Sequence, residues 1–513
     1  MSQEQMVLFP GRTLEEFVGE IENLTKEIQD LYCLDQIPWI VGYSGGKDST
    51  ATLQLVWNAI SQLPIEKRTK TIYVITTDTL VENPLVAAWM RASLKKIKIA
   101  AEAQQMPFEA HLLHPEISDT YWVCLLGKGY PLPRAKFRWC TTRLKINPSN
   151  RFIRDILRNY GETILVLGVR KAESYMRGKR MNELEKKRLR DRLNPNSYLP
   201  NSLVYSPIEK WQTKEVWMYL MQWENPWQHS NKELFDMYRS ISEENECPLV
   251  VDSNTPTCGN SRFGCWTCTL VSKEQSLSAM IKNDEEKEWL QPLLDLRLEL
   301  DLDIEKDKTR RDFRRIYGKV ELFSRKNEDN DDIIQPIHGP YLREWREYLL
   351  RRLLEVQKKL RENAPANLTE INLISDEELS EIRRIWLEEK HEFDDSLPRI
   401  YKEVTGEDFK DSRLGGERKL LGTDEWEILT EICDDDSMHL ELMAKLLDTE
   451  RQFYSKYRRH GIYEQLEKCF ESSSRNKEEA LNNARNKWDL KDAVDKGDVE
   501  KVKQLTWQNI KFN

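Results

Sequence analysis

Apolar residues recur along the chain in two kinds of pattern, and each pattern predicts a different type of element. Helical spacing predicts an amphipathic helix over residues 11–33, with its apolar face formed by Leu14, Phe17, Ile21, Leu24 and Ile28. Short apolar, β-branched runs then alternate with helical segments, at 38–43, 71–77, 108–113 and 163–169. This alternation is typical of a mostly parallel sheet with helices on both faces. We therefore expect an α/β core.

The pattern of the chain changes along its length, and the changes predict five parts. These are an N-terminal helical segment at 1–36, the α/β domain at 37–235, an irregular cysteine-rich segment at 236–284, a charged helical domain at 285–475 and a polar tail at 476–513. The tail is polar enough that we expect it to be loosely ordered. The acidic stretch 327–332 is expected to form an exposed loop.

A glycine-containing segment follows the first apolar run. Residues 42–50 read Gly-Tyr-Ser-Gly-Gly-Lys-Asp-Ser-Thr. Gly45 and Gly46 allow successive N–H groups to turn toward one point, and a helix that starts near Ser49 adds the positive end of its dipole. With the charge of Lys47, the segment predicts a cradle for a polyphosphate. A plain glycine turn between a strand and a helix is the alternative.

This segment is not a Walker A loop. That motif has four residues between its first glycine and the Gly-Lys pair, and a Ser or Thr follows the lysine. Here three residues separate Gly42 from Gly46, and Asp48 follows Lys47.

Composition narrows the class of protein. The 513 residues contain no apolar run long enough to span a membrane, and the N-terminus lacks the basic and apolar regions of a signal peptide. We therefore expect a cytoplasmic protein without a membrane partner. The net charge of −9 argues against a generally basic nucleic-acid-binding protein, although local basic faces remain compatible with it. The nine cysteines are then expected to be reduced, ligating or catalytic.

Four cysteines form a candidate metal site. Cys265 and Cys268 form a C-x-x-C pair, Cys258 lies shortly before them, and Cys140 in the α/β domain is the best fourth ligand, with Cys247 as the alternative. Four thiolates suit a 4Fe–4S cluster or structural zinc, and the single C-x-x-C pair favours the cluster over zinc. Redox-active thiols without metal are the third possibility. The remaining cysteines are not expected to bind metal but to be buried like small apolar residues: Cys33, Cys124, Cys433 and Cys469.

Positive charge is concentrated around Cys140. Between residues 134 and 158 the only acid is Asp155, and the balance of eight basic residues and one acid is +7. Such a segment suits phosphate groups of nucleotide or nucleic acid. The DNA-phosphate candidates are Arg138, Arg143, Lys145, Arg151 and Arg154. A second basic run at 170–192 is interspersed with acids, and for both runs a solvated helix face is the alternative. Nearby tryptophans could stack on bases or shield a cluster: Trp122, Trp139 and Trp266.

Three stretches together resemble the phosphoadenosine-phosphosulfate (PAPS) reductase branch of the PP-loop superfamily. They are Ser44–Ser49, Arg138–Lys145 with Cys140, and Leu167–Ser174 with Arg177, and Asp78-Thr79 also matches that branch. The resemblance covers roughly residues 35–235 and implies a PP-loop, adenine nucleotide alpha hydrolase-like core. The chain is about twice as long as the simple reductases. It also lacks the paired adjacent cysteines of adenylyl-sulfate reductases, because Thr141 follows Cys140.

The whole pattern resembles the DndC family, the ATP pyrophosphatases and iron–sulfur proteins of bacterial DNA phosphorothioation. It is also similar to the SspD family of a related single-strand system. The resemblance implies cleavage of ATP to AMP and pyrophosphate, with magnesium, to activate a DNA phosphate whose non-bridging oxygen sulfur replaces. The implied partners are DNA, a cysteine desulfurase and other Dnd proteins.

The resemblance also implies roles for individual residues. Lys47, Asp48 and Ser44 are the catalytic candidates. The ATP-binding set is Ser44, Gly45, Gly46, Lys47, Asp48, Ser49, Asp78, Arg170 and Arg177. Three other functions compete with this one: a tRNA sulfurtransferase, a phosphosulfate reductase that uses Cys140 as its nucleophile, and an iron–sulfur scaffold or sensor that only binds nucleotide.

Overall fold

The computed structural model forms two compact units, each built from several chain segments. The first comprises Met1–Tyr121, Pro133–Leu298 and Leu360–Ile371, and the second comprises Trp122–Leu132, Glu299–Lys359 and Asn372–Asn513. The structure describes residues 13–134, 137–188, 190–196, 198–240, 264–270, 276–301, 303–326, 332–365, 371–411, 423–433, 436–454, 459–471, 473 and 476–511. The predicted ligand Cys258, the residue Cys247 that was the alternative to Cys140 as fourth ligand, and most of the acidic stretch 327–332 lie outside these residues.

A six-stranded sheet forms the centre of the first unit. Its strand order is β3-β2-β1-β4-β6-β5, and every pair is parallel except β5 with β6. The strands are β1 Trp39–Gly42, β2 Ile72–Thr77, β3 Phe108–Leu113, β4 Thr163–Val166, β5 Asn194–Pro195 and β6 Ser202–Tyr205. The first four confirm the strands predicted from the apolar runs. The short β5 and β6 were not predicted.

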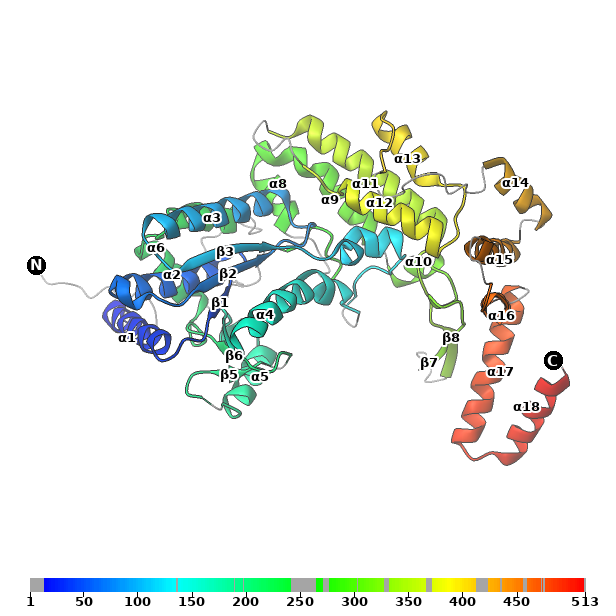
Figure 1. Cartoon of the computed structure of the whole chain (residues 1–513), viewed down its shortest axis with the longest axis horizontal. Coiled ribbons are helices and arrows are strands. Elements are labelled where there is room, and N and C mark those ends of the chain that lie inside the picture. The colour runs from blue at the N-terminus through cyan, green and yellow to red at the C-terminus, as the bar shows by residue number, and fades with distance from the viewer. Residues whose placement is uncertain are drawn as a thin grey trace, which may run out of the picture. The chain divides into compact units, whose positions relative to one another are not determined.

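Helices cover both faces of this sheet, as expected (Figure 1). Trp39 and Val41 point into the larger core, with residues of α1 Leu14–Cys33, α2 Lys47–Ser61, α3 Pro84–Ala103 and α6 Thr213–Gln222. Ile40, between them, points into a smaller core with Ile153 and Ile156 of α4 Asn147–Tyr160. Successive side chains of a strand face opposite sides, so this alternation fixes both layers.

The helix predicted at 11–33 is α1. Its start is fixed by a capping box, in which the Thr13 side chain accepts from the Glu16 amide and the Glu16 carboxylate accepts from the Thr13 amide. Cys33 is the last residue of α1 and is exposed, so the expectation that it is a buried apolar residue is wrong. Cys124 and Cys433 are buried, as expected. The other helices that begin in this unit are α5 Tyr175–Glu185, α7 Asn231–Ser240, α8 Ser276–Asn283 and α9 Gln291–Leu300.

The second unit is mostly helical and contains one β-hairpin, β7 Leu322–Lys326 with β8 Asp332–Pro336. Buried leucines line one side of α11 Arg343–Asn363, among them Leu349, Leu350 and Leu353. The indole of Trp386 donates to the carbonyl of Leu126 at 2.8 Å. The remaining helices are α10 Ile304–Thr309, α12 Asp376–Arg384, α13 Ser396–Thr405, α14 Thr423–Ile432, α15 Ser437–Tyr454, α16 Ile462–Glu471, α17 Lys477–Asp495 and α18 Val499–Lys511.

The C-terminal residues differ from the sequence prediction. The stretch expected to be loosely ordered forms α17 and α18, and the Asn476 side chain caps the first of them by accepting from the Glu479 amide. The scarcity of apolar residues predicted disorder here, but charged residues are also good helix formers. Within the described part of the chain, every helix is too short or too polar to cross a membrane.

Candidate active site

The glycine segment lies where a buried strand becomes a helix. β1 ends at Gly42, and α2 begins at Lys47 with Gly46 in the extended conformation as its cap residue. Gly45 has a φ of 72°, in the left-handed region that glycine adopts without steric cost. The turn therefore leads the chain from β1 directly into the first turn of α2, which begins at Lys47 rather than near Ser49.

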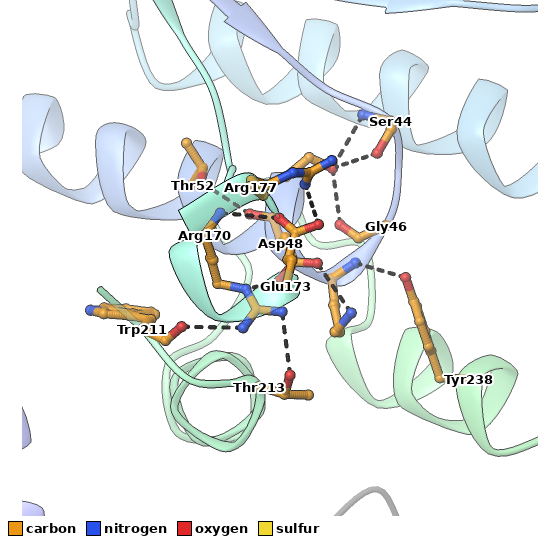
Figure 2. A network of polar contacts seen from close by, with 12 residues as sticks. Ser44, Gly46, Asp48, Thr52, Arg170, Glu173, Arg177, Trp211, Thr213 and Tyr238 are labelled. Carbon is orange, nitrogen blue, oxygen red and sulfur yellow. Dashed lines mark hydrogen bonds and ion pairs between the residues drawn. The ribbon is translucent and has the colours of Figure 1, made fainter. Parts of the chain in front are cut away.

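Serine side chains hold this turn closed. The Ser49 hydroxyl donates to the Gly46 carbonyl at 2.9 Å and accepts from the Ser44 amide at 3.1 Å. The Ser44 and Ser49 hydroxyls are also 3.1 Å apart (Figure 2). Ser44 and Ser49 thus fix the shape of the loop.

The topology of the sheet places this loop at a switch point. The chain runs outward from β1 to β2 and β3, and then returns to place β4 on the other side of β1. Loops after two such neighbouring strands leave in opposite directions, and ligands of open α/β sheets bind in the crevice between them. Here the two loops are residues 43–46 and 167–170.

Close backbone contact joins these two loops. A Cβ atom on Gly168 would lie 2.6 Å from the carbonyl oxygen of Asp48 and 2.8 Å from the Thr52 hydroxyl. Only glycine allows this approach, which sets the distance between α2 and the segment that carries Arg170.

Arg170 and Asp48 form the central ion pair of the site. Arg170 Nε lies 2.7 Å from Asp48 Oδ1, and Lys47 Nζ lies 3.1 Å from Asp48 Oδ2. The Arg170 guanidinium also donates to the Trp211 carbonyl at 3.1 Å and to the Thr213 hydroxyl at 3.3 Å (Figure 2). Arg170 and Lys47 are 3% and 5% exposed, so the loop encloses two buried cations around one carboxylate.

A second ion pair lies beside the first. Glu173 accepts from the Arg170 amide at 3.0 Å and pairs with Arg177 of α5 (Figure 2). The predicted phosphate ligands Arg170 and Arg177 are thus both near the loop, and each is paired with a carboxylate.

Asp78 lies directly after β2 and is 1% exposed. Its carboxylate accepts from the Leu80 amide at 2.9 Å and pairs with Arg91 of α3 at 2.7 Å. Asp78 therefore stands at the predicted sheet edge with its charge compensated by Arg91, a partner that no sequence motif indicated.

Three predicted cluster ligands lie close enough to influence one another's charge. Burial raises the pKa of the Cys265 thiol to about 11, while Lys145 opposes that shift. Burial also raises the pKa of Cys140, and the charge of Cys268 adds to the effect. The pKa of Lys145 is raised, chiefly by Cys265 and also by Glu82. Within the described residues, no three His, Cys, Asp or Glu side chains are arranged to hold a metal ion.

The cysteine loop is attached to the edge of the sheet. Cys265 forms an antiparallel bridge with Glu82, and the Trp266 amide donates to the Val81 carbonyl at 3.0 Å. The Thr79 hydroxyl lies 3.4 Å from Cys265 Sγ. The sequence-distant cysteines are thus brought to the carboxyl end of β2. Trp139 and Trp266 are buried, which favours the shielding role over base stacking.

The positive charge of the basic segment 134–158 is offset more than its local sequence suggested. Arg143 pairs with Asp119, Arg151 lies 3.0 Å from Glu116, and Lys145 lies 3.8 Å from Glu82. The inference that compensating acids are missing is therefore wrong, because these acids come from residues outside the segment. Arg138 and Arg154 are exposed. In the second basic run, ion pairs engage Lys171, Arg177, Arg188, Arg190 and Arg192.

Tyr238 is a further site residue that sequence reasoning missed. Its hydroxyl accepts from the Lys47 amide at 3.3 Å. It lies 191 positions from Lys47 and belongs to no motif, so no sequence signal singles it out.

Comparison with known proteins agrees with this geometry. Residues 38–271 match the family model described as the phosphoadenosine phosphosulfate reductase domain. An uncharacterized protein of Methanocaldococcus jannaschii is 27% identical over 220 residues, which are 43% of this chain and 37% of that protein. The chain thus matches little more than a third of that relative's length.

Solved structures with some similarity include PAPS reductase from Candida auris in a phosphate complex, with 14% identity, a TM-score of 0.26, and coverage of 41% of this chain and 87% of that chain. Another is the U34-tRNA thiolase NcsA from Methanococcus maripaludis with its 4Fe–4S cluster. It has 14% identity and a TM-score of 0.27, and the match covers 57% of this chain and 83% of that chain.

The matched region begins at β1 and contains the glycine loop, Arg170, Tyr238 and the C-x-x-C pair. The mostly parallel sheet, the loop at its switch point and the family match lead to one conclusion: residues 38–271 match the PAPS reductase domain, and their described part has an open α/β fold.

Proposed function

We propose that this protein is the ATP-dependent sulfurtransferase component of DNA phosphorothioate modification, as in the DndC family. The observation that carries the proposal is the loop at the switch point. It presents the N-terminal amides of a helix and a buried lysine, as a phosphate site requires, yet it lacks the Walker A spacing. A PP-loop nucleotide site of this kind suits cleavage between the α and β phosphates.

The proposed reaction has two steps. A non-bridging oxygen of the DNA phosphate attacks the α-phosphorus of ATP, the bond to the β-phosphate oxygen breaks, and pyrophosphate leaves. A sulfide-level sulfur nucleophile from the cysteine desulfurase system and a reductant then attacks the DNA phosphorus, and AMP leaves with the original oxygen. The adenylate makes that oxygen a good leaving group, which explains the need for ATP.

The residues of the loop have distinct parts in the first step. The amides of Gly45, Gly46 and the first turn of α2 would hold the pyrophosphate portion. Lys47 would neutralise charge that develops on the leaving group. Asp48 holds Lys47 and Arg170 on either side of its carboxylate, so it would orient both cations toward the phosphates.

Magnesium would neutralise the triphosphate in this scheme. Asp48 and Asp78 are both paired with basic residues, so the phosphate oxygens would supply most of its ligands, as is usual for magnesium bound with a nucleotide.

A 4Fe–4S cluster is part of the proposal. Cys140, Cys265, Cys268 and Cys258 would hold it; the first three influence the pKa of Lys145, and their side chains would have to move to bind one cluster. A cluster there would supply sulfur or electron chemistry.

Protein purified without oxygen should contain about four iron and four sulfide per chain. Cys265→Ser should lower the iron content, and Cys433→Ser, at a buried position in the second unit, should not. Stoichiometric zinc without sulfide would reject the cluster.

DNA would approach along the exposed basic residues of α4 and the turn before it. Arg154 and Arg138 are exposed, and Arg151 forms a surface ion pair with Glu116. Phosphates can displace such weak partners, because a surface ion pair contributes little.

The decisive experiment for the DNA substrate is mass spectrometry of nuclease-digested host DNA. Phosphorothioate dinucleotides should be present with the wild-type gene and absent with the Lys47→Ala variant. Sulfur that appears instead in tRNA bases, and is lost with the same variant, would identify a tRNA thiolation enzyme. Conversion of phosphosulfate to sulfite without ATP would identify a reductase, and nucleotide binding without any turnover would identify a scaffold or sensor.

A further inference from the structure

Residues 43–46 and the first turn of α2 are called the phosphate loop from here on. Tyr238 contacts this loop from a different element. It belongs to α7, and its hydroxyl accepts from the Lys47 amide at 3.3 Å (Figure 2). Its ring centroid is 5.2 Å from Lys47 Nζ, and a Cβ atom on Gly46 would come within 3.1 Å of its hydroxyl. Tyr238 is 6% exposed, so this contact is buried.

The amide that Tyr238 occupies is one that an anion would use. Lys47 is the first residue of α2, and the amides of a first helical turn have no partner within the helix. Anions bind at helix N-termini through these amides. The Tyr238 hydroxyl oxygen therefore stands where a phosphate oxygen would bind.

We propose that Tyr238 is a positioning residue that competes with the nucleotide phosphates for the Lys47 amide, and that nucleotide binding releases it. The inference rests on the proposed function in one respect, namely that the ligand of the loop is a nucleoside triphosphate. Without nucleotide, Tyr238 satisfies a buried amide that would otherwise be costly to leave without a hydrogen bond. With nucleotide, a phosphate oxygen takes over that amide.

Release of Tyr238 acts on the helix that precedes the cysteine-rich segment. α7 ends at Ser240, whose carbonyl accepts from Asn283 Nδ2 at 3.0 Å, and the chain then continues toward Cys258. The hydroxyl contact links the occupancy of the phosphate loop to α7. We therefore expect nucleotide binding to loosen α7.

The test compares two buried tyrosine variants of the full chain. Tyr238→Phe keeps the ring beside Lys47 and removes only the competing hydroxyl. The control is Tyr219→Phe, which removes a buried hydroxyl that accepts from Asn58 Nδ2 at 3.2 Å, away from the loop. The probe is the α,β-methylene analogue of ATP, which resists cleavage at the proposed bond, and its Kd is measured by calorimetry.

Tyr238→Phe should bind the analogue about two- to tenfold more tightly than the wild type, the range that corresponds to one net hydrogen bond. Tyr219→Phe should bind it as the wild type does. Unchanged or weaker binding by Tyr238→Phe would overturn the inference, because Tyr238 would then be neutral or a phosphate ligand.

Hydrogen exchange of the wild-type protein gives an independent result that does not depend on a variant. Amides of 231–240 should exchange faster when the analogue is bound. Equal or slower exchange would overturn the inference. If the wild-type protein does not bind the analogue at all, the proposed function itself fails, and this inference fails with it.

Discussion

Arg170 is the side chain that joins the loop after β4 to α2 and to the start of α6. Its guanidinium reaches Asp48 of α2, the Trp211 carbonyl and the Thr213 hydroxyl, all at once. Because Arg170 is almost fully buried, these partners have little access to water that could replace it. The same residue therefore supports both the fold and the electrostatics of the phosphate loop.

Arg170→Ala should lower the free energy of unfolding by about 3 kcal/mol, since it removes one of the two cations that pair with Asp48 and the buried contacts of the guanidinium with Trp211 and Thr213. The matched control is Arg158→Ala, because Arg158 pairs with Asp155 on the exposed side of α4. That change should cost less than about 0.5 kcal/mol. Urea denaturation measures both. Equal effects of the two variants would show that Arg170 is not a structural hub.

His229 makes the stability of the first unit depend on pH. Its ring stacks on Trp89 with centroids 3.7 Å apart, and burial lowers its pKa to about 4. In the unfolded state the histidine has its usual pKa of 6.5, whereas in the folded state it stays neutral down to about pH 4. The unfolded state therefore binds more protons below pH 6.5. Stability should therefore fall as the pH drops from about 6.5 toward 4, by up to about 1.4 kcal/mol per pH unit.

The measurement is urea denaturation at several pH values in this window. His229→Gln should flatten the profile, and His114→Gln, at an exposed position, should leave it unchanged. A wild-type profile that is as flat as that of His229→Gln would refute this assignment.

The sequence predicted the residues of the loop itself but not their partners from elsewhere. Ser44, Gly45, Gly46, Lys47 and Ser49 lie in one contiguous motif, and all of them fall at the strand–helix junction. Arg91 and Tyr238 come from α3 and α7, where helical periodicity says which face is buried but not which loop that face meets.

At the scale of elements, the contact between α2 and the segment after β4 sets the width of the site. Gly168 packs directly on the backbone of Asp48, and the next turn carries Arg170. A side chain at position 168 would separate the two elements and stretch the Arg170–Asp48 pair.

Gly168→Ala should therefore destabilise the protein by about 1–3 kcal/mol, the usual cost of an added methyl group in a tightly packed site, and should weaken nucleotide binding. Gly19→Ala is the opposite control. Gly19 lies inside α1 with open space around its Cβ position, so alanine there should stabilise by up to about 1 kcal/mol. Thermal denaturation of both variants checks the signs. A neutral Gly168→Ala would mean that the loops can separate without cost.

The prediction of strands succeeded where burial of the strand produced a long run of apolar residues. The runs at 38–43, 71–77, 108–113 and 163–169 are apolar because most of these strands are buried on both faces. β6 has only four residues and begins with a serine, and β5 has two, so neither leaves a periodic signal. The helical order of 477–511 was missed because the same charged residues suit both a disordered tail and an exposed helix.

Across the whole molecule, the proposed function depends on chemistry brought together from distant parts of the chain. The phosphate loop follows β1, and the cysteine loop is attached after β2. Both therefore lie at the carboxyl edge of one parallel sheet. Sequence placed the phosphate loop at a strand end, but it could not show where the cysteine loop attaches or which ion pairs reduce the charge of the basic segment.

The exposed basic residues of α4 should govern binding to DNA. Arg151→Glu with Arg154→Glu should flatten the dependence of DNA affinity on salt and lower DNA sulfur content in the assembled complex, because each phosphate contact contributes about −0.9 to the log–log slope on duplex DNA. The matched control is Lys95→Glu with Lys98→Glu. These lysines are exposed on α3, which covers the other face of the sheet. Equal effects of the two double variants would show that only net charge matters.

The loop after β1 is proposed to cleave ATP between its α and β phosphates. The most direct measurement is product analysis of ATP incubated with the assembled complex and DNA, by phosphorus NMR. The wild-type protein should release AMP and pyrophosphate in equal amounts, and Lys47→Ala should release neither while its unfolding transition stays intact. ADP and orthophosphate as the products, lost with the same Lys47 variant, would contradict the account.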